Sequence, residues 1–352
     1  MKLSDFDFEL PNELIALRPV NPRSSSKLLV SKDDKIIDDQ FLNLLKYLKK
    51  GDRLVLNDTK VIPAKLHGKR IRHSDNGRTT ANIGINLLST NNDGHWLALA
   101  KPAKRVNVGE IINFDNELTA KVLDKSSNGL VLQFNLSEEI FDQKLKEIGT
   151  MPLPPYIASQ RLPDKLDDND YQTVFAEKSG SVAAPTASLH FDDVLLKQLN
   201  DFGIKTSKVT LHVGAGTFLP VKVDNIADHK MHSEWGEVNN IAASEIAKTK
   251  SEGGRIIPVG TTALRLIETA AKSGKINAGK LSNRKQISFF HIFISNMSKC
   301  FRGYFDRASG NRYPFSLIFT ANSNHLRATL LCKMGQFVAH DEAAFCTGFA
   351  RI

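Results

Sequence analysis

Residues 64 to 135 hold six short strand-like segments, and this run constrains the fold more than any other part of the chain. Turn sequences separate the segments, including Asp75-Asn76-Gly77, Asn92-Asp93-Gly94 and Ser127-Asn128-Gly129. The six segments are residues 64–71, 83–89, 95–101, 110–114, 118–124 and 129–135. Short strands at this spacing predict a small antiparallel β-barrel.

The segments on both sides of this run show an α/β pattern instead. The predicted strands are 27–30, 53–56, 209–213 and 255–260, and the predicted helices are 13–16, 41–48, 193–202, 241–250 and 261–271. The helix over 193–202 has apolar residues at Val194, Leu195, Leu199 and Phe202 and should end at Gly203. We therefore predict a mixed α/β main domain, residues 1–63 plus 150–280. The barrel, residues 64–149, interrupts it as a separable domain without a catalytic acid or base.

A proline-rich segment, MPLPPYI, connects the two predicted domains after the barrel. Pro152, Pro154 and Pro155 argue against a helix or a central strand there, because proline lacks an N–H and clashes with a preceding helical turn. We expect an irregular crossing over this segment.

The stretch from Gly180 to Pro220 holds the most suggestive polar residues. Two strand-like segments each deliver a histidine and a hydroxyl to a glycine-rich turn: His190 with Thr186, and His212 with the turn Gly214-Ala215-Gly216-Thr217. Glycine lets the backbone approach a ligand closely. A βα packing unit with tight turns explains either half equally well. The GxG at 214–216 is too short to indicate a dinucleotide site.

Two further polar groups follow predicted strands. Asn57-Asp58-Thr59 comes directly after the strand over 53–56, where α/β sheets place binding groups, although an Asx turn is an equal alternative. Thr261 and Thr262 open the helix that follows the strand over 255–260, which is a plausible anion site. We expect residues 180–190, residues 209–217 and Arg265 to line one shared ligand pocket.

Several long segments, in one order over residues 1 to 276, resemble the S-adenosylmethionine:tRNA ribosyltransferase-isomerase family of queuosine biosynthesis. They include residues 180–191 and 209–221, and also DFDFELPNELIALRPVNPR at 5–23, LNDTKVIPAKLHG at 56–68, GTMPLPPYI at 149–157, YQTVFAEKSG at 171–180, MHSEWGEV at 231–238 and VGTTALRLIE at 259–268. Many ordered matches are far more specific than one motif. Beyond about Lys280 the resemblance stops.

The resemblance implies a larger α/β domain with a small barrel, and a transferase-isomerase activity. The ribosyl group of S-adenosylmethionine would be transferred onto 7-aminomethyl-7-deazaguanine at the tRNA wobble position. Epoxyqueuosine-tRNA, adenine and methionine would be the products. S-adenosylmethionine is then a ribosyl-donor substrate, and no cofactor or metal is expected. The chemistry needs a base for a proton activated by the sulfonium and a proton source for the departing adenine.

The segments that carry the resemblance also supply suitable groups. The candidate catalytic residues are His190, His212, His232, Glu234 and Glu268, and the candidate substrate-binding residues are Asp58, Thr186, Gly214, Gly216, Thr217, Thr261, Thr262 and Arg265. Arg265 can clamp a carboxylate in bidentate fashion, or it can form a surface ion pair with Glu268, three residues further along the helix. Ser188 and Ser24 depart from the family pattern, which has glycine and aspartate there.

Composition indicates an ordinary globular protein. The net charge is +9, which favours a polyanionic partner, but residues 281–352 contribute +6 of it and the first 280 residues only +3. A tRNA contact in the main body would therefore use a local patch, and KLHGKRIRH at 65–73 is either such a contact or a solvated edge strand. No apolar run is long enough to span a membrane, and the N-terminal residues lack a basic-then-apolar signal. We therefore expect a cytoplasmic monomer.

The residues from 281 onward differ sharply from the rest. They hold all three cysteines, Cys300, Cys332 and Cys346, without CxxC spacing, and 10 of the 20 phenylalanines. In the family, the chain continues with segments like ETDIF and LTNFHLP. Codons can be chosen for residues 284–289 and 315–320 such that the same bases, read in a shifted frame, encode ETDIF and LTNFH. We predict an aberrant tail over 281–352 caused by a frameshift, against the alternative of a divergent tail.

A catalytically impaired relative that only binds tRNA or an adenosyl ligand is the competing function, and a plain α/β binding protein is a third.

Overall fold

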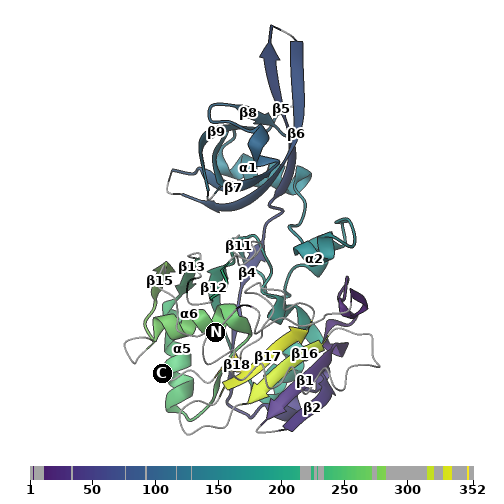
Figure 1. Cartoon of the computed structure of the whole chain (residues 1–352). Coiled ribbons are helices and arrows are strands. Elements are labelled where there is room, and N and C mark those ends of the chain that lie inside the picture. The colour runs from purple at the N-terminus through teal and green to yellow at the C-terminus, as the bar shows by residue number, and fades with distance from the viewer. Residues whose placement is uncertain are drawn as a thin grey trace.

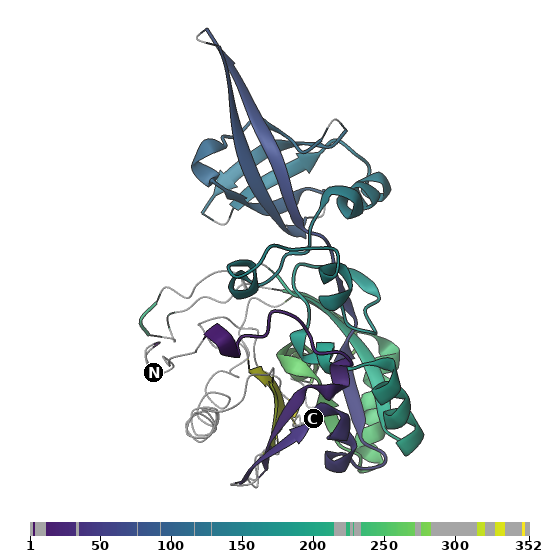
Figure 2. The same cartoon turned by 90° about the vertical axis from the view of Figure 1, so that its right-hand side faces the viewer.

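The structure, a computed structural model, describes residues 3, 12–32, 35–75, 77–91, 93–115, 117–127, 129–214, 223–225, 228, 234–271, 276–282, 315–320, 328–334 and 347–348. They form an α/β main domain and a closed β-barrel that stands above it (Figures 1 and 2). The predicted mixed α/β fold with an inserted antiparallel barrel is confirmed.

A five-stranded mixed sheet forms the centre of the main domain. Its order is β14-β3-β12-β13-β15, with β14 Ile256–Pro258, β3 Arg53–Asn57, β12 Lys205–His212, β13 Trp235–Val238 and β15 Gly279–Ser282. β3 runs parallel to β12 and β14, while β13 and β15 are antiparallel. All five residues of β3 are buried, which is typical of a strand covered on both faces.

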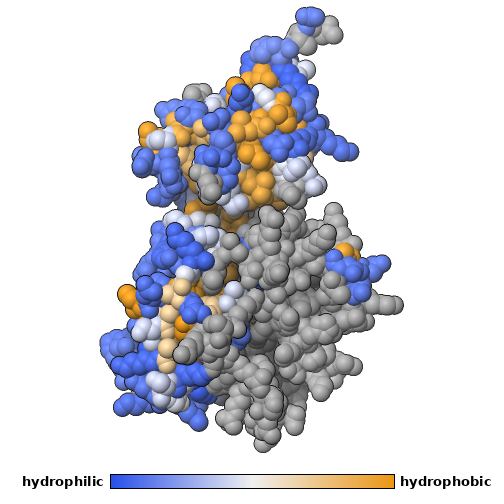
Figure 3. All heavy atoms as spheres, turned by 90° about the vertical axis from the view of Figure 1, so that its left-hand side faces the viewer, coloured by the Kyte–Doolittle hydropathy of each residue, from blue (hydrophilic) through white to orange (hydrophobic). Residues whose placement is uncertain are grey.

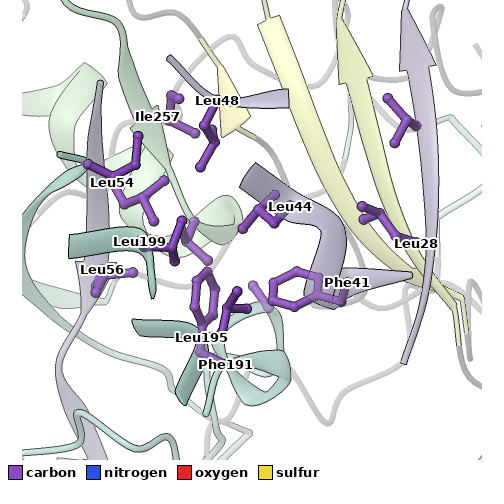
Figure 4. Packing of buried hydrophobic residues seen from close by; sticks show 14 of the residues in the cluster. Leu28, Phe41, Leu44, Leu48, Leu54, Leu56, Phe191, Leu195, Leu199 and Ile257 are labelled. Atoms are coloured by element: carbon purple, nitrogen blue, oxygen red, sulfur yellow. The ribbon is translucent and has the colours of Figure 1, made fainter. Parts of the chain in front are cut away.

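Alternation along β3 divides the core into two layers. Leu54 and Leu56 join one apolar cluster and Val55 joins the other, because successive side chains of a strand point to opposite faces. The Val55 cluster is completed by α5 (Asn240–Ser251) and α6 (Gly260–Ala270). The Leu54 cluster is completed by α4 (Asp193–Phe202) and the 3₁₀ helix η4 (Phe41–Tyr47), as Figure 4 shows.

Capping groups fix the ends of α4. The Asp192 side chain accepts a hydrogen bond from the Leu195 N–H at 2.9 Å, and Gly203 ends the helix with a φ of +95°. The predicted helix is thus confirmed, but only Leu195 and Leu199 of its predicted apolar face are buried. Val194 and Phe202 are 67% and 45% exposed and lie outside the core.

A second sheet has the order β18-β17-β16-β1-β2. Its strands are β18 Thr347–Gly348, β17 Ala328–Met334, β16 Phe315–Thr320, β1 Lys27–Lys32 and β2 Lys35–Gln40. β1 pairs with β2 in antiparallel and with β16 in parallel orientation. Most of residues 281–352 lie outside the described part of the chain, so the predicted aberrant tail stays a prediction.

The barrel contains all six predicted strands in the closed order β10-β7-β6-β5-β8-β9. They are β5 Lys65–Ser74, β6 Gly77–Thr90, β7 Trp96–Lys101, β8 Ile111–Asn113, β9 Thr119–Ser126 and β10 Gly129–Phe134, with the 3₁₀ helix η5 (Ala103–Arg105) between β7 and β8. The sequence interpretation missed α1 (Glu138–Ile148), whose Phe141 and Leu145 are buried in the barrel core.

Short elements fill the connections, and two of them correct the sequence interpretation. They are the 3₁₀ helices η2 (Asn12–Leu14), η3 (Arg23–Ser25) and η6 (Thr186–His190), the helices α2 (Pro155–Ala158) and α3 (Asp167–Asp170), and the paired strands β4 (Thr59–Val61) and β11 (Lys178–Ser181). Pro155 begins α2, a position where the missing N–H costs nothing, so the expected absence of a helix was wrong. The His190 segment is η6 rather than a strand.

None of the helices in the described part of the chain is both long and apolar enough to cross a membrane.

Candidate active site

The candidate residues gather where the parallel strands β3, β12 and β14 end. Asp58 and Thr59 follow β3, His212 is the last residue of β12, and Gly260 opens α6 directly after β14. The carboxyl ends of parallel strands meet at one edge of a sheet, where α/β proteins bind ligands. β4 continues from this edge into the first barrel strand, so the barrel stands over the same edge (Figure 1).

Asn57 fixes the ends of β3 and β12 relative to one another. Its fully buried side-chain amide donates to the Leu211 carbonyl at 3.0 Å, and its Oδ1 accepts from the Leu211 N–H at 2.9 Å. The side chain thereby extends the strand pairing beyond Val209, the last backbone partner of β3. This lock positions the residues that follow each strand.

His212 is held from three sides. Its Nδ1 lies 2.7 Å from the Thr59 hydroxyl, and its ring stacks on Trp235 with centroids 4.9 Å apart and an interplanar angle of 18°. The stacking follows from register, since His212 and Trp235 are direct cross-strand partners. On the third side lies Gly180, where a Cβ atom would approach His212 Nε2 to 2.9 Å.

Burial and charge together set the protonation of His212. Burial lowers the pKa of its imidazole, and the nearby Lys178 ammonium lowers it further. The ring is therefore neutral at pH 7, with one nitrogen bonded to Thr59. A neutral, fixed imidazole can accept a proton from a substrate.

Asp58 directly precedes Thr59, the hydrogen-bond partner of this histidine. Its buried carboxylate accepts a hydrogen bond from the Thr210 hydroxyl at 2.7 Å, and Thr210 lies two residues before His212 on one face of β12. Burial raises the pKa of Asp58 although Thr210 and Lys178 oppose the shift. The Asp58 carbonyl accepts from the N–H groups of Glu177 and Lys178, so Asp58 ties β11 to the strand ends.

A second polar group lies at the end of β12 and on α6. Arg265 donates to Glu234 Oε2 at 2.6 Å, and Glu234 Oε1 accepts from the Gly214 N–H at 3.0 Å. The ion pair of Arg265 in the described part of the chain is thus with Glu234, outside its own helix, rather than with Glu268. Burial raises the pKa of Glu268, which favours its protonated form.

His190 lies in a different environment from His212. It is 5% exposed, its Nδ1 is 2.8 Å from the Ser26 hydroxyl, and its ring lies 5.3 Å from that of Phe41. These contacts place it beside the core cluster shared by η4 and α4. They match a structural histidine, so a catalytic role for His190 stays a prediction.

The start of α6 meets η6 at a close contact. Gly260 has a φ of +87°, and a Cβ there would lie 2.7 Å from that of Ala187. Thr262 is buried, and its hydroxyl has no hydrogen-bond partner among the described residues. Thr261 is partly exposed, and Thr186 begins η6. Gly216, Thr217 and His232 lie outside the described residues.

Three residues of this site were not among the candidates. Asn57 and Thr59 belong to the polar trio after β3, from which only Asp58 was selected. Trp235 follows Glu234 within the segment MHSEWGEV. Cross-strand register decides these contacts, and a single sequence does not reveal it.

Comparison with known proteins identifies the family of this chain. A family model described as "Queuosine biosynthesis protein" matches residues 3–300. The chain belongs to this family. The match continues past Lys280, so the expected end of the family resemblance was too early.

Curated relatives share long alignments with this family member. The S-adenosylmethionine:tRNA ribosyltransferase-isomerase of Ruegeria pomeroyi is 58% identical over 276 residues, which cover 78% of this chain and 79% of that protein. The Zymomonas mobilis protein of the same name is 48% identical over 271 residues, 77% of each chain. A crystal structure of the Thermotoga maritima S-adenosylmethionine tRNA ribosyltransferase is 28% identical. It covers 80% of this chain and 78% of its own, with a TM-score of 0.37.

Proposed function

We propose that this protein transfers and isomerises the ribosyl group of S-adenosylmethionine onto 7-aminomethyl-7-deazaguanine at the tRNA wobble position. The products are epoxyqueuosine-tRNA, adenine and methionine. Family membership supports this reaction, and the Ruegeria and Zymomonas relatives carry the corresponding name. A cytoplasmic, monomeric state is part of the proposal.

The observation that carries the mechanism is the fixed, neutral His212. Thr59 and Trp235 hold its ring at the carboxyl ends of the strands, and burial with Lys178 lowers its pKa. The reaction begins by removal of a proton that the sulfonium makes acidic. We assign His212 as the base, because it is uncharged at pH 7 and oriented before substrate binds.

Glu268 and Arg265 take complementary parts in the proposal. Burial raises the pKa of Glu268, and we assign this carboxyl group as the proton donor for departing adenine. Arg265 lies one helical turn away and is already oriented by Glu234. Its guanidinium can bind the methionine carboxylate of the donor. Arg265 would then either contact Glu234 and the donor carboxylate together or dissociate from Glu234.

The test is release of adenine from S-adenosylmethionine by the purified full chain. We expect release that requires tRNA carrying 7-aminomethyl-7-deazaguanine, together with a new ribosylated nucleoside by mass spectrometry. Unmodified tRNA serves as the matched control. No adenine above that control, with tRNA bound in a gel shift, would establish the impaired relative instead, an alternative that nothing in the comparisons favours.

A further inference from the structure

The hairpin of β5 and β6 is longer than the barrel requires. β5 pairs with β8 only at Lys69 and Arg70, and β6 pairs with β7 from Gly84 onward. The two strands nevertheless continue to pair with each other as far as Ser74 and Gly77. Their outer ends form a two-stranded ribbon that projects from the barrel, away from the main domain (Figure 2).

Register defines one polar face of this ribbon. Lys69 lies opposite Asn82, and His73 lies opposite Arg78. Directly opposed residues share a face, and so do residues two apart along one strand. This face, which we term the cationic ribbon, therefore carries the side chains Lys65, Lys69, His73, Arg78, Asn82 and Asn86. Lys69, His73, Arg78 and Asn82 are exposed.

The two strands of the hairpin carry charge of one sign, and the exposed Asp75 in the turn between them adds one acidic side chain at the tip. β5 and β6 contain five Lys or Arg residues and no Asp or Glu. Arg72 pairs with Glu110, but register places it on the opposite face. Arg70 donates to the Arg105 carbonyl at 3.0 Å, which brings the exposed Lys104 and Arg105 of η5 beside the hairpin. Arg70 lies on the same face as Arg72, so Lys104 and Arg105 add positive charge beside the hairpin on the face opposite the cationic ribbon.

The shape of the cationic ribbon fits an extended polyanion. Lys65 and His73 are eight residues apart on one strand, a span of about 26 Å at strand rise. Lysine, arginine and asparagine are the residues that contact phosphates and sugars along a nucleic-acid backbone. The side chain of Ile71 on this face is already half-buried within the chain. It therefore does not offer the aromatic or aliphatic anchor that a protein partner would bury. In Figure 3 the tip of the barrel domain is hydrophilic, and an apolar area begins below it and runs down the barrel toward the main domain.

We propose that the cationic ribbon binds the phosphate backbone of the folded RNA whose modified base enters the active site. The inference rests on the proposed function and assigns its RNA-docking surface. The chain supplies the connection, because it runs from Thr59, which contacts His212, through β4 to Lys65 at the base of the ribbon within six residues. An RNA with one base at His212 therefore lies beneath the barrel and within reach of the ribbon.

The test compares RNA affinity in two matched charge-reversal pairs. Lys69→Glu/Arg78→Glu changes the ribbon, and Lys248→Glu/Lys250→Glu changes two exposed lysines on α5, which ends near the amino ends of the parallel strands. The full chain is titrated into labelled tRNA by fluorescence anisotropy from 50 to 200 mM salt. We expect the ribbon pair to raise Kd about 10- to 100-fold and to reduce the salt slope by about two. The α5 pair should change Kd less than threefold.

Two further readouts keep the inference independent of folding and of the proposed function. Lys69→Gln/Arg78→Gln removes the charges with less strain and should raise Kd in the same direction, with the circular dichroism of the wild type. S-adenosylmethionine affinity should stay unchanged in every variant. A ribbon-pair Kd within twofold of wild type, or no salt-dependent tRNA binding by the wild type, would overturn the inference. Adenine release is measured separately. If the ribbon variants weaken tRNA binding but the wild type releases no adenine, only the proposed function is refuted.

Discussion

Replacing Gly180 with alanine places a methyl group against the ring of His212. The new Cβ would lie 2.9 Å from Nε2 and 3.1 Å from both neighbouring ring carbons, closer than van der Waals contact allows. Gly180 also has a φ of +139°, which strains any residue with a side chain by about 1–3 kcal/mol. Crowding of the half-buried ring adds about 1–3 kcal/mol. We expect a total loss of ~2–6 kcal/mol in the free energy of unfolding.

Gly279→Ala is the matched control for Gly180→Ala. Its φ is +156°, and a Cβ there meets nothing within 4 Å, so backbone strain alone lowers the stability of this variant. Urea unfolding should separate the two variants by about 1–3 kcal/mol. Single-turnover adenine release should fall about 100-fold only in Gly180→Ala, because the base is displaced from its position. Equal stabilities and equal rates in the two variants would refute the contact between Gly180 and His212.

Three further predictions follow from charge and burial. Lys178→Met should raise the pKa of His212, so the acid limb of the kcat/KM profile should move to higher pH; an unmoved limb contradicts this. Burial alone would raise the pKa of Asp167, but the hydrogen bond from Arg161 and nearby charges lower it overall. Asp167→Asn should therefore cost ~3 kcal/mol at pH 7, measured by urea unfolding, and the wild type should lose this contribution as pH falls below about 4. Ser188→Ala should raise the unfolding free energy by ~1–2 kcal/mol, since the buried Ser188 hydroxyl has no partner among the described residues; a loss would show that it is satisfied.

The barrel was predictable because its pattern is local. Period-two alternation and turn residues mark each strand, and all six predicted strands are confirmed. The helix α1 was missed because its buried face consists of only Phe141 and Leu145. The short helix at Pro155 was missed because proline disfavours a helix interior but favours its first residue.

The candidate site was predictable only in part because its geometry depends on register. His212, Asp58 and Arg265 stand out as polar residues near predicted strand or helix ends. The stacking of Trp235 and the hydrogen bond from Thr59 arise only when β12 pairs with β13 and lies beside β4. Gly180 lies against His212, and Gly214 donates to Glu234, the ion-pair partner of Arg265, while the expected shared pocket stays a prediction. The frameshift in the tail stays a prediction, which resequencing the gene around codons 284–289 decides.

The central claim, that His212 is the base of the ribosyl transfer, is tested most directly by one rate. Adenine release is measured in a single turnover with saturating S-adenosylmethionine and modified tRNA, for the wild type and for His212→Gln. The account predicts a rate about 10²- to 10⁴-fold lower in the variant, with S-adenosylmethionine affinity within threefold of wild type. A variant rate within fivefold of the wild type would contradict it.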